Sequence, residues 1–336
     1  MALNLSNIES NMSNKNIETR GIDWNLDGYK KEAHFFLCGA FESFSFIHSF
    51  LKKVKECPWI LKDNVVIDSV FGSPTCIWNG GRTLDNVYYN KQQLQNIHDS
   101  YAKLGVKVRF IFTNSLLNEH DRYDRYCNLI MDIFQDQSPE VVVNSSMLED
   151  YLRDKYPTLS FISSTTKRLR SSEAQLKEFN HEYKYICLDY DYNYNFEFLD
   201  NIQEDERNRV EILINSICPK GCNVRVLHQE FSAKRQLEYD NDDNCDESNP
   251  FYKECPLKKR CQELPMSEQG YTKDFLSGTN YILPQDLDKY LDKDFCHFKI
   301  QGRELTSSQM FAEFFPYLIK PEFYPMAISI INNSIQ

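Results

Sequence analysis

Five cysteines in the second half of the chain have the residue type and the spacing that best fit a chemical function. The mostly apolar run 210–215, rich in β-branched residues, predicts a buried strand. A Cys-x3-Cys pair, Cys218 and Cys222, follows this strand closely. The next stretch of about 40 residues contains Cys245, Cys255 and Cys261. Thiolates are soft metal ligands, and a tetrahedral site needs four ligands that converge. The sequence therefore predicts a metal centre.

The predicted ligands of a [4Fe–4S] cluster are Cys218, Cys222, Cys255 and Cys261, with Cys245 as a substitute. The chain has no Cys-x2-Cys knuckle, and only one histidine lies close to these cysteines, so zinc is the less natural alternative. A third interpretation is a set of unliganded buried thiols, although packing explains poorly why so many cysteines lie in a polar stretch.

Polar side chains that follow the predicted strands supply the other candidates for a site. Loops begin where strands end, so each of these residues also has an ordinary explanation. We predict a catalytic role for four of them: Asn144, Asp189, Arg225 and His228. We predict that four others position the substrate, in particular an anionic group of it: Arg82, Asn114, Lys299 and Arg303. For Arg82, a plain surface arginine is the competing interpretation.

Short apolar runs alternate with amphipathic helical patterns along most of the chain. The predicted strands are 34–40, 65–71, 107–113, 141–144, 159–163, 185–189, 210–215 and 296–300. The predicted helices are 46–56, 91–104, 123–134, 147–155, 172–179, 196–202 and 285–291, with a terminal helix from about Ser307. This alternation predicts a parallel sheet. Eight such units in roughly 280 residues fit a closed (β/α)8 TIM-like barrel better than an open sheet, and barrel sites lie at the carboxyl ends of the strands.

Composition and charge narrow the class of protein. The chain has 336 residues, and 41% of them are hydrophobic, which predicts a globular protein. Its formal net charge of −11 argues against a protein that binds nucleic acid without sequence specificity. No run approaches the roughly 20 apolar residues of a membrane span, and the N-terminus lacks the apolar core of a signal peptide. We expect a cytoplasmic protein with a leader over 1–30, a barrel over 31–336, and a cysteine-rich insertion at 218–275 after the seventh strand.

A short segment near the last strand resembles a known family. The run from Phe298 to Arg303, Phe-Lys-Ile-Gln-Gly-Arg, is similar to the Lys-Ile-Glu-Gly-Arg signature of the collagenase-like peptidase family, number thirty-two of the unassigned (U) class, with Gln301 in place of glutamate. The resemblance covers residues 33 to 305. Further segments agree with the family in their order and spacing: 65–72 with Gly81-Arg82, 141–144, 157–165, the Cys218–Cys222 pair and 282–287.

The resemblance implies a barrel with a [4Fe–4S] cluster on four cysteines, and oxygen-independent hydroxylation of RNA bases or a quinone precursor. Cys218 and Cys222 match the first cysteine pair of the family. The usual fourth cysteine near 282–287 is absent, so Cys255 and Cys261 are assigned by proximity alone.

Two functions from different classes follow as hypotheses. The first is an iron–sulfur enzyme that hydroxylates, or transfers an atom to, a nucleobase, an aromatic compound or another small substrate. The alternative is a binding or scaffold protein, stabilised by zinc or a cluster, that acts with a partner protein. A protease fits least well, because the sequence has neither His-Glu-x-x-His nor Gly-x-Ser-x-Gly.

Overall fold

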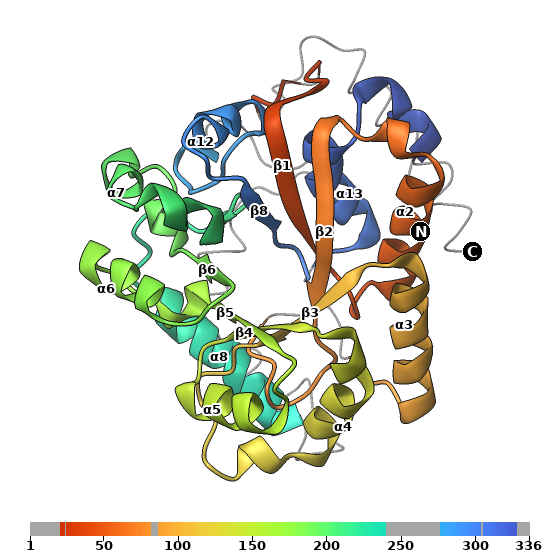
Figure 1. The fold of residues 1–336 in the computed structure, drawn as a ribbon, viewed down its shortest axis with the longest axis vertical. Helices are drawn as coiled ribbons and strands as arrows, with labels where there is room; N and C mark the ends of the chain where they lie inside the picture. Colours follow the sequence, from red (N-terminus) through yellow and green to blue (C-terminus); the bar gives the residue numbers. More distant parts are fainter. Residues whose placement is uncertain (1–20, 24, 82–86, 240–275, 304, 328–336) are drawn as a thin grey trace.

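Eight parallel strands close into a barrel in the computed structural model of the protein (Figure 1). The structure describes residues 21–23, 25–81, 87–239, 276–303 and 305–327. The strands are β1 (Gly28–Cys38), β2 (Asp63–Gly72), β3 (Lys107–Phe112), β4 (Glu140–Val143), β5 (Ser160–Ser163), β6 (Tyr185–Cys187), β7 (Val210–Leu213) and β8 (His297–Ile300). Each strand pairs with the next, and β8 pairs with β1. The predicted (β/α)8 barrel is confirmed.

Helices follow the strands and surround them (Figure 1). They are α2 (Phe44–Glu56), α3 (Lys91–Leu104), α4 (Arg125–Phe134), α5 (Ser146–Lys155), α6 (Ser172–Lys177), α7 (Phe196–Asp200), α8 (Arg225–Tyr239), α12 (Asp288–Leu291) and α13 (Ser307–Leu318). Local sequence sets their ends: Asn90 and Gln93 form a capping box at the start of α3, and Gly105 ends that helix with a φ of 72°. None of the described helices combines the length and the apolar character that crossing a membrane requires.

Two elements differ from the sequence prediction. β1 begins at Gly28, not at His34, because the side chain of Tyr29 is buried and its hydroxyl donates to the carbonyl of Tyr317 across 2.9 Å. Helix α8 was not predicted at all, since its segment was assigned to the cysteine-rich insertion. Its polar, mostly straight-chain residues favour a helix without marking a strong apolar face.

The centre of the barrel contains buried charge. Arg109 of β3 is fully buried, and its Nε lies 2.5 Å from Glu140 of β4 while its Nη1 contacts Glu211 of β7. The guanidinium stacks on the ring of Phe36, 3.7 Å from the ring centroid. A buried ion of this kind requires partners on several sides because burial removes its water. The apolar core extends to the surrounding helices, where rings such as Phe46 of α2 and Phe311 of α13 meet.

Candidate functional site

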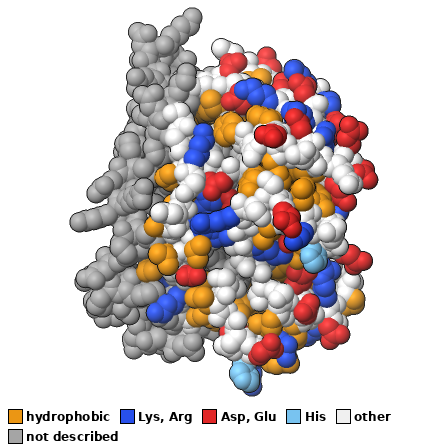
Figure 2. Space-filling view, turned by 90° about the vertical axis from the view of Figure 1, so that its left-hand side faces the viewer, with side chains coloured by type: hydrophobic (Ala, Val, Ile, Leu, Met, Phe, Trp, Pro, Cys, Tyr) orange, Lys and Arg blue, Asp and Glu red, His pale blue; other side chains and the backbone are white. Residues whose placement is uncertain are grey.

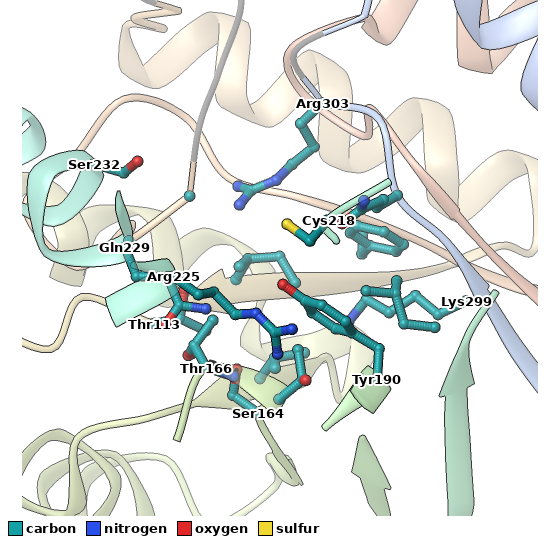
Figure 3. A pocket seen from close by; sticks show the side chains of 18 of the residues that line it. Thr113, Ser164, Thr166, Tyr190, Cys218, Arg225, Gln229, Ser232, Lys299 and Arg303 are labelled. Atoms are coloured by element: carbon teal, nitrogen blue, oxygen red, sulfur yellow. Dashed lines mark hydrogen bonds between the residues drawn. The ribbon is translucent and has the colours of Figure 1, made fainter. Parts of the chain in front are cut away.

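A cavity of about 150 Å³ opens at the carboxyl ends of the strands, the place where the barrel fold predicts a site. Loops that follow β2, β3, β5, β6, β7 and β8 line it, and α8 contributes a further wall. In Figure 3, Arg303 enters from one side, Tyr190 and Arg225 lie on the other, and Cys218 is placed between them. Charged, hydroxyl, thiol and aromatic side chains therefore meet in one small space.

Arg225, the first residue of α8, is held by the loop that follows β6. Its Nη1 lies 2.7 Å from Oδ1 of Asp189, and its Nη2 lies 2.8 Å from Oδ1 of Asp191. Between these two carboxylates, the guanidinium stands 3.8 Å from the centroid of the Tyr190 ring. Burial alone would lower the pKa of Arg225, but Tyr190 and the two aspartates raise it above its ordinary value. The cation is fixed in place and stays charged.

Cys218 lies in the cavity wall beside Tyr190. It is half-buried and packs against Cys187, Tyr190 and Leu213. Burial, followed by the proximity of Cys218, raises the pKa of Tyr190, so its hydroxyl keeps its proton. Cys222 is also half-buried and lies on the same loop, directly after Gly221, whose φ is 64°. That left-handed conformation favours glycine and lets the loop bend between the two thiols.

Lys299 of β8 joins the cavity to the buried charges of the barrel. Its Nζ lies 3.2 Å from Oε1 of Glu211 and 4.5 Å from the centroid of the Phe71 ring. Burial raises the pKa of Glu211, but Lys299 and Arg109 outweigh it and lower that pKa to about 2. Burial, followed by the charge of the nearby Glu211 carboxylate, raises the pKa of the Cys187 thiol to about 12.

The side chain of Arg303 reaches the cavity by passing close to Gly81. Its Nη1 lies 3.1 Å from Oδ1 of Asn79 and 3.3 Å from Oε1 of the buried Glu42. A Cβ atom added to Gly81 would lie 1.3 Å from Nη2 of Arg303, so any larger residue there would displace the guanidinium. A Cβ atom on Gly80 would lie 2.3 Å from the carbonyl oxygen of Thr113. Gly81 therefore leaves room for Arg303, and Gly80 lets the loop after β2 approach the backbone of Thr113.

The loop after β5 contributes a row of hydroxyl groups. Ser164 Oγ and Thr166 Oγ1 lie 2.8 Å apart, and Thr166 also accepts from the Asn144 amide across 2.8 Å. Thr165 Oγ1 is buried and has no hydrogen-bond partner among the described residues. Buried polar atoms are nearly always satisfied, so an unpartnered hydroxyl in a cavity wall marks a position where a ligand atom can bind.

The predicted site residues fall into four groups. Five of them line the cavity: Cys218, Arg225, His228, Lys299 and Arg303. Three support the wall from behind: Asp189 holds Arg225, Asn144 holds Thr166, and Asn114 donates to the carbonyls of Ile77 and Ala233. Cys222 follows Cys218 on the same loop but does not line the cavity. Arg82, Cys245, Cys255 and Cys261 lie outside the described residues.

Several residues of the site were missed by the sequence analysis. Tyr190 and Asp191 directly follow Asp189, and the pattern Asp-Tyr-Asp-Tyr at 189–192 could have drawn attention to them. Glu211 and Arg109 sit inside apolar strands, and a charged residue in such a run is itself a signal that it is paired. Around Cys218 and Cys222, the described part of the chain holds no group of three or more ligand side chains.

The outer surface adds no strong electrostatic feature on the face shown in Figure 2. Acidic and basic side chains are interspersed there among apolar ones, without a continuous basic area. A surface that binds nucleic acid by its phosphates needs clustered cations. On this face, the charge pattern offers no such footprint.

Comparison with known proteins identifies the fold. No protein-family model matches the chain, and no curated protein matches it in sequence. The solved structure of the U32 peptidase Mk0906 is similar, with a TM-score of 0.50 and 15% sequence identity over 82% of this chain and 94% of that one. The two proteins share the barrel fold, and the resemblance predicted for residues 33 to 305 is supported at the level of fold.

Proposed function

We propose that the protein is an iron–sulfur enzyme that hydroxylates, or transfers an atom to, a small polar substrate bound in the cavity. The observation that carries the proposal is the position of Cys218, whose thiol lines the same cavity as three cationic side chains: Arg225, Lys299 and Arg303. A thiolate ligand at this point would place a cluster directly beside the bound substrate.

The surroundings of the cysteine pair fit an anionic metal cluster. Cys218 and Cys222 would supply two ligands, and the predicted Cys255 and Cys261 would complete the set. Tyr190 packs against Cys218, and the Arg225 cation lies over the Tyr190 ring. Hydrogen bonds and nearby positive charge stabilise the net negative charge of a thiolate-bound cluster. When bound, such a cluster supplies electron transfer or Lewis-acid activation.

The walls of the cavity define the substrate class. Arg225, Lys299 and Arg303 are all paired with carboxylates behind them, so they present fixed donors and a modest positive field. Thr165 offers a free hydroxyl, and Phe71 and Tyr190 offer aromatic faces. These groups suit a small flat molecule, such as an aromatic ring or a nucleobase, that carries a carboxylate or phosphate. Arg303 stands where it can pair with that anionic group.

Metal and sulfide analysis of the full chain, purified without oxygen, tests the proposal. We expect a brown protein with about four iron and four sulfide ions per chain. Cys218→Ser and Cys222→Ser should each lose most of the iron, whereas Cys57→Ser, at the end of α2, should keep it. A colourless protein that binds one zinc ion and takes up no iron on reconstitution would refute the cluster and favour the metal-stabilised scaffold protein.

A peptidase is the second candidate, because the similar structure is named as one and because Cys218 and His228 line the same cavity. A thiol and an imidazole are the groups that cysteine-dependent peptide hydrolysis uses. The two candidates differ in what they require of Cys222. Hydrolysis of a casein or gelatin substrate would need Cys218 and His228 but not Cys222, and it would proceed in iron-free protein. The proposed enzyme needs both cysteines and shows no such hydrolysis.

A further inference from the structure

Three side chains that can bind a metal meet at the other end of the barrel, away from the cavity. His34 lies on β1, and Cys296 and His297 lie at the start of β8. One ligand atom from each of the three lies within 4.8 Å of the others. We propose that these residues form a binding site for Zn²⁺ or a similar divalent transition metal, separate from the proposed cluster and independent of the proposed function.

The distances between the ligand atoms are close to those of a metal site. In a tetrahedral zinc centre, neighbouring sulfur and nitrogen ligands are about 3.5 Å apart, given the usual Zn–S and Zn–N bond lengths. Cys296 Sγ lies 3.6 Å from His297 Nδ1. The two imidazole centroids are 5.0 Å apart, so small side-chain rotations bring a nitrogen of His34 within reach of the same ion.

Carboxylates around His34 supply what a zinc-binding histidine needs. Nδ1 of His34 lies 3.0 Å from each carboxylate oxygen of Asp68 on β2. Metal-binding histidines commonly donate one ring N–H to a carboxylate, which fixes the ring and leaves the other nitrogen for the metal. That other nitrogen, Nε2, lies 2.9 Å from Oε1 of Glu32, an exposed side chain. A water molecule, or Glu32 after rotation of its exposed side chain, would supply the fourth ligand.

The charges around the site fit a divalent cation. His297 is buried against the rings of Phe36 and Tyr185, which hold its imidazole beside Cys296. Cys296 would lose its thiol proton to solvent on binding, and Glu32 and Asp68 would balance the charge of the ion.

The position of this metal site predicts that a bound ion stabilises the barrel. His34 and His297 are direct partners in the pairing of β1 with β8, the pairing that closes the barrel. An ion bound to both strands would fasten the first strand to the last. Binding to the folded state alone would raise the midpoint of thermal unfolding as the metal concentration rises.

Protection of Cys296 from alkylation, read peptide by peptide by mass spectrometry, tests this site without interference from the other cysteines. The full chain, treated with a chelator and then dialysed, is alkylated with and without ZnCl₂. At a free Zn²⁺ concentration ten times the dissociation constant, about a tenth of the sites would be empty, so alkylation of Cys296 should slow about tenfold. Cys57, which is also half-buried, serves as the internal reference.

Variants identify the ligands. His34→Gln and His297→Gln should abolish the protection of Cys296 by Zn²⁺, whereas His120→Gln, in an exposed loop, should keep it. Co²⁺ should add a thiolate-to-metal absorption band that Cys296→Ser lacks in a Cys218→Ser/Cys222→Ser background. An unchanged alkylation rate of Cys296 in the folded wild-type chain at millimolar Zn²⁺ would overturn the proposal, whatever metal the cavity binds.

Discussion

Nζ of Lys299 lies 3.2 Å from Oε1 of Glu211, and this ion pair joins the wall of the cavity to the buried charges in the centre of the barrel. Glu211 is fully buried and also contacts Arg109, which in turn pairs with Glu140. The cation that faces the cavity is thus positioned by strands, not by a loop. Side chains held by rigid elements keep their geometry before a ligand arrives.

Removal of the charge on Glu211 should destabilise the whole barrel. In Glu211→Gln, the buried cations of Arg109 and Lys299 lose a partner, and breaking a buried ion pair from one side costs about 3–5 kcal/mol. Urea unfolding of the variant and the wild type measures this difference. The control is Glu173→Gln, an exposed residue paired with Lys177, which should cost less than about 1 kcal/mol. Equal stability of Glu211→Gln and the wild type would show that the buried charges contribute nothing.

The same residue predicts a pH dependence. The pKa of Glu211 is about 2 in the fold, below its ordinary value of 4.5, because Lys299 and Arg109 outweigh the effect of burial. A depressed carboxyl pKa contributes stability that is fully present above pH 4.5 and is lost as the pH falls toward 2. The stability difference between the wild type and Glu211→Gln should therefore shrink by about 3 kcal/mol over that range. A difference that stays constant from pH 6 to pH 2 would contradict the assigned ion pairs.

Loss of the Arg225 guanidinium should leave Asp189 buried without its charged partner. Asp189 and Arg225 are both almost fully buried, and their 2.7 Å contact links the loop after β6 to α8. We expect Arg225→Leu to lose about 3–5 kcal/mol of unfolding free energy. The double variant Arg225→Leu/Asp189→Asn should recover part of this loss, because it leaves no unpaired charge among the fully buried groups, and Asp191 is partly exposed to water. Arg125→Leu, at an exposed position on α4, is the control.

The Tyr190 hydroxyl should tune the proposed cluster. Tyr190→Phe removes the hydroxyl of the ring that packs against Cys218 and leaves the ring and its contact with Arg225 in place. An O–H dipole near a ligand sulfur offsets negative charge, so its loss should make the reduction potential more negative while iron content stays unchanged. Redox titration followed by absorption measures this shift. Tyr194→Phe, whose hydroxyl donates to the carbonyl of Tyr281 away from the cavity, should not move the potential.

Asn114 should fasten α8 over the cavity. Its amide nitrogen donates to Ala233 of α8 across 3.1 Å and to Ile77 across 2.7 Å, and its oxygen accepts from the Leu116 N–H. Asn114→Ala removes these hydrogen bonds at about 0.5–1.5 kcal/mol each, so amide exchange in α8 should accelerate. Asn96→Ala, exposed on α3, is the matched control.

Unchanged exchange in α8, combined with weaker binding of an anionic ligand, would instead support the direct role in substrate binding predicted for Asn114 from the sequence.

The barrel could be predicted because most strands are apolar runs followed along the chain by a helical pattern. Both patterns are local, so they can be recognised without knowledge of the fold. Cys218, Lys299 and Arg303 could be placed near one site since they follow strands that end at the same edge. Side-chain partners could not be predicted in this way. Arg225 with Tyr190, or Arg303 with Gly81, are far apart along the chain, and only packing decides that they meet. Helix α8 was missed because cysteine content outweighed its weak periodicity.

The pairing of β1 with β8 has a consequence for how the protein matures. A ribosome releases β1 early and β8 only near the end of synthesis, so the first strand waits with one hydrogen-bonding edge exposed while most of the chain emerges. Lys30, Lys31 and Glu32 on that edge would discourage contact with other nascent chains during the delay.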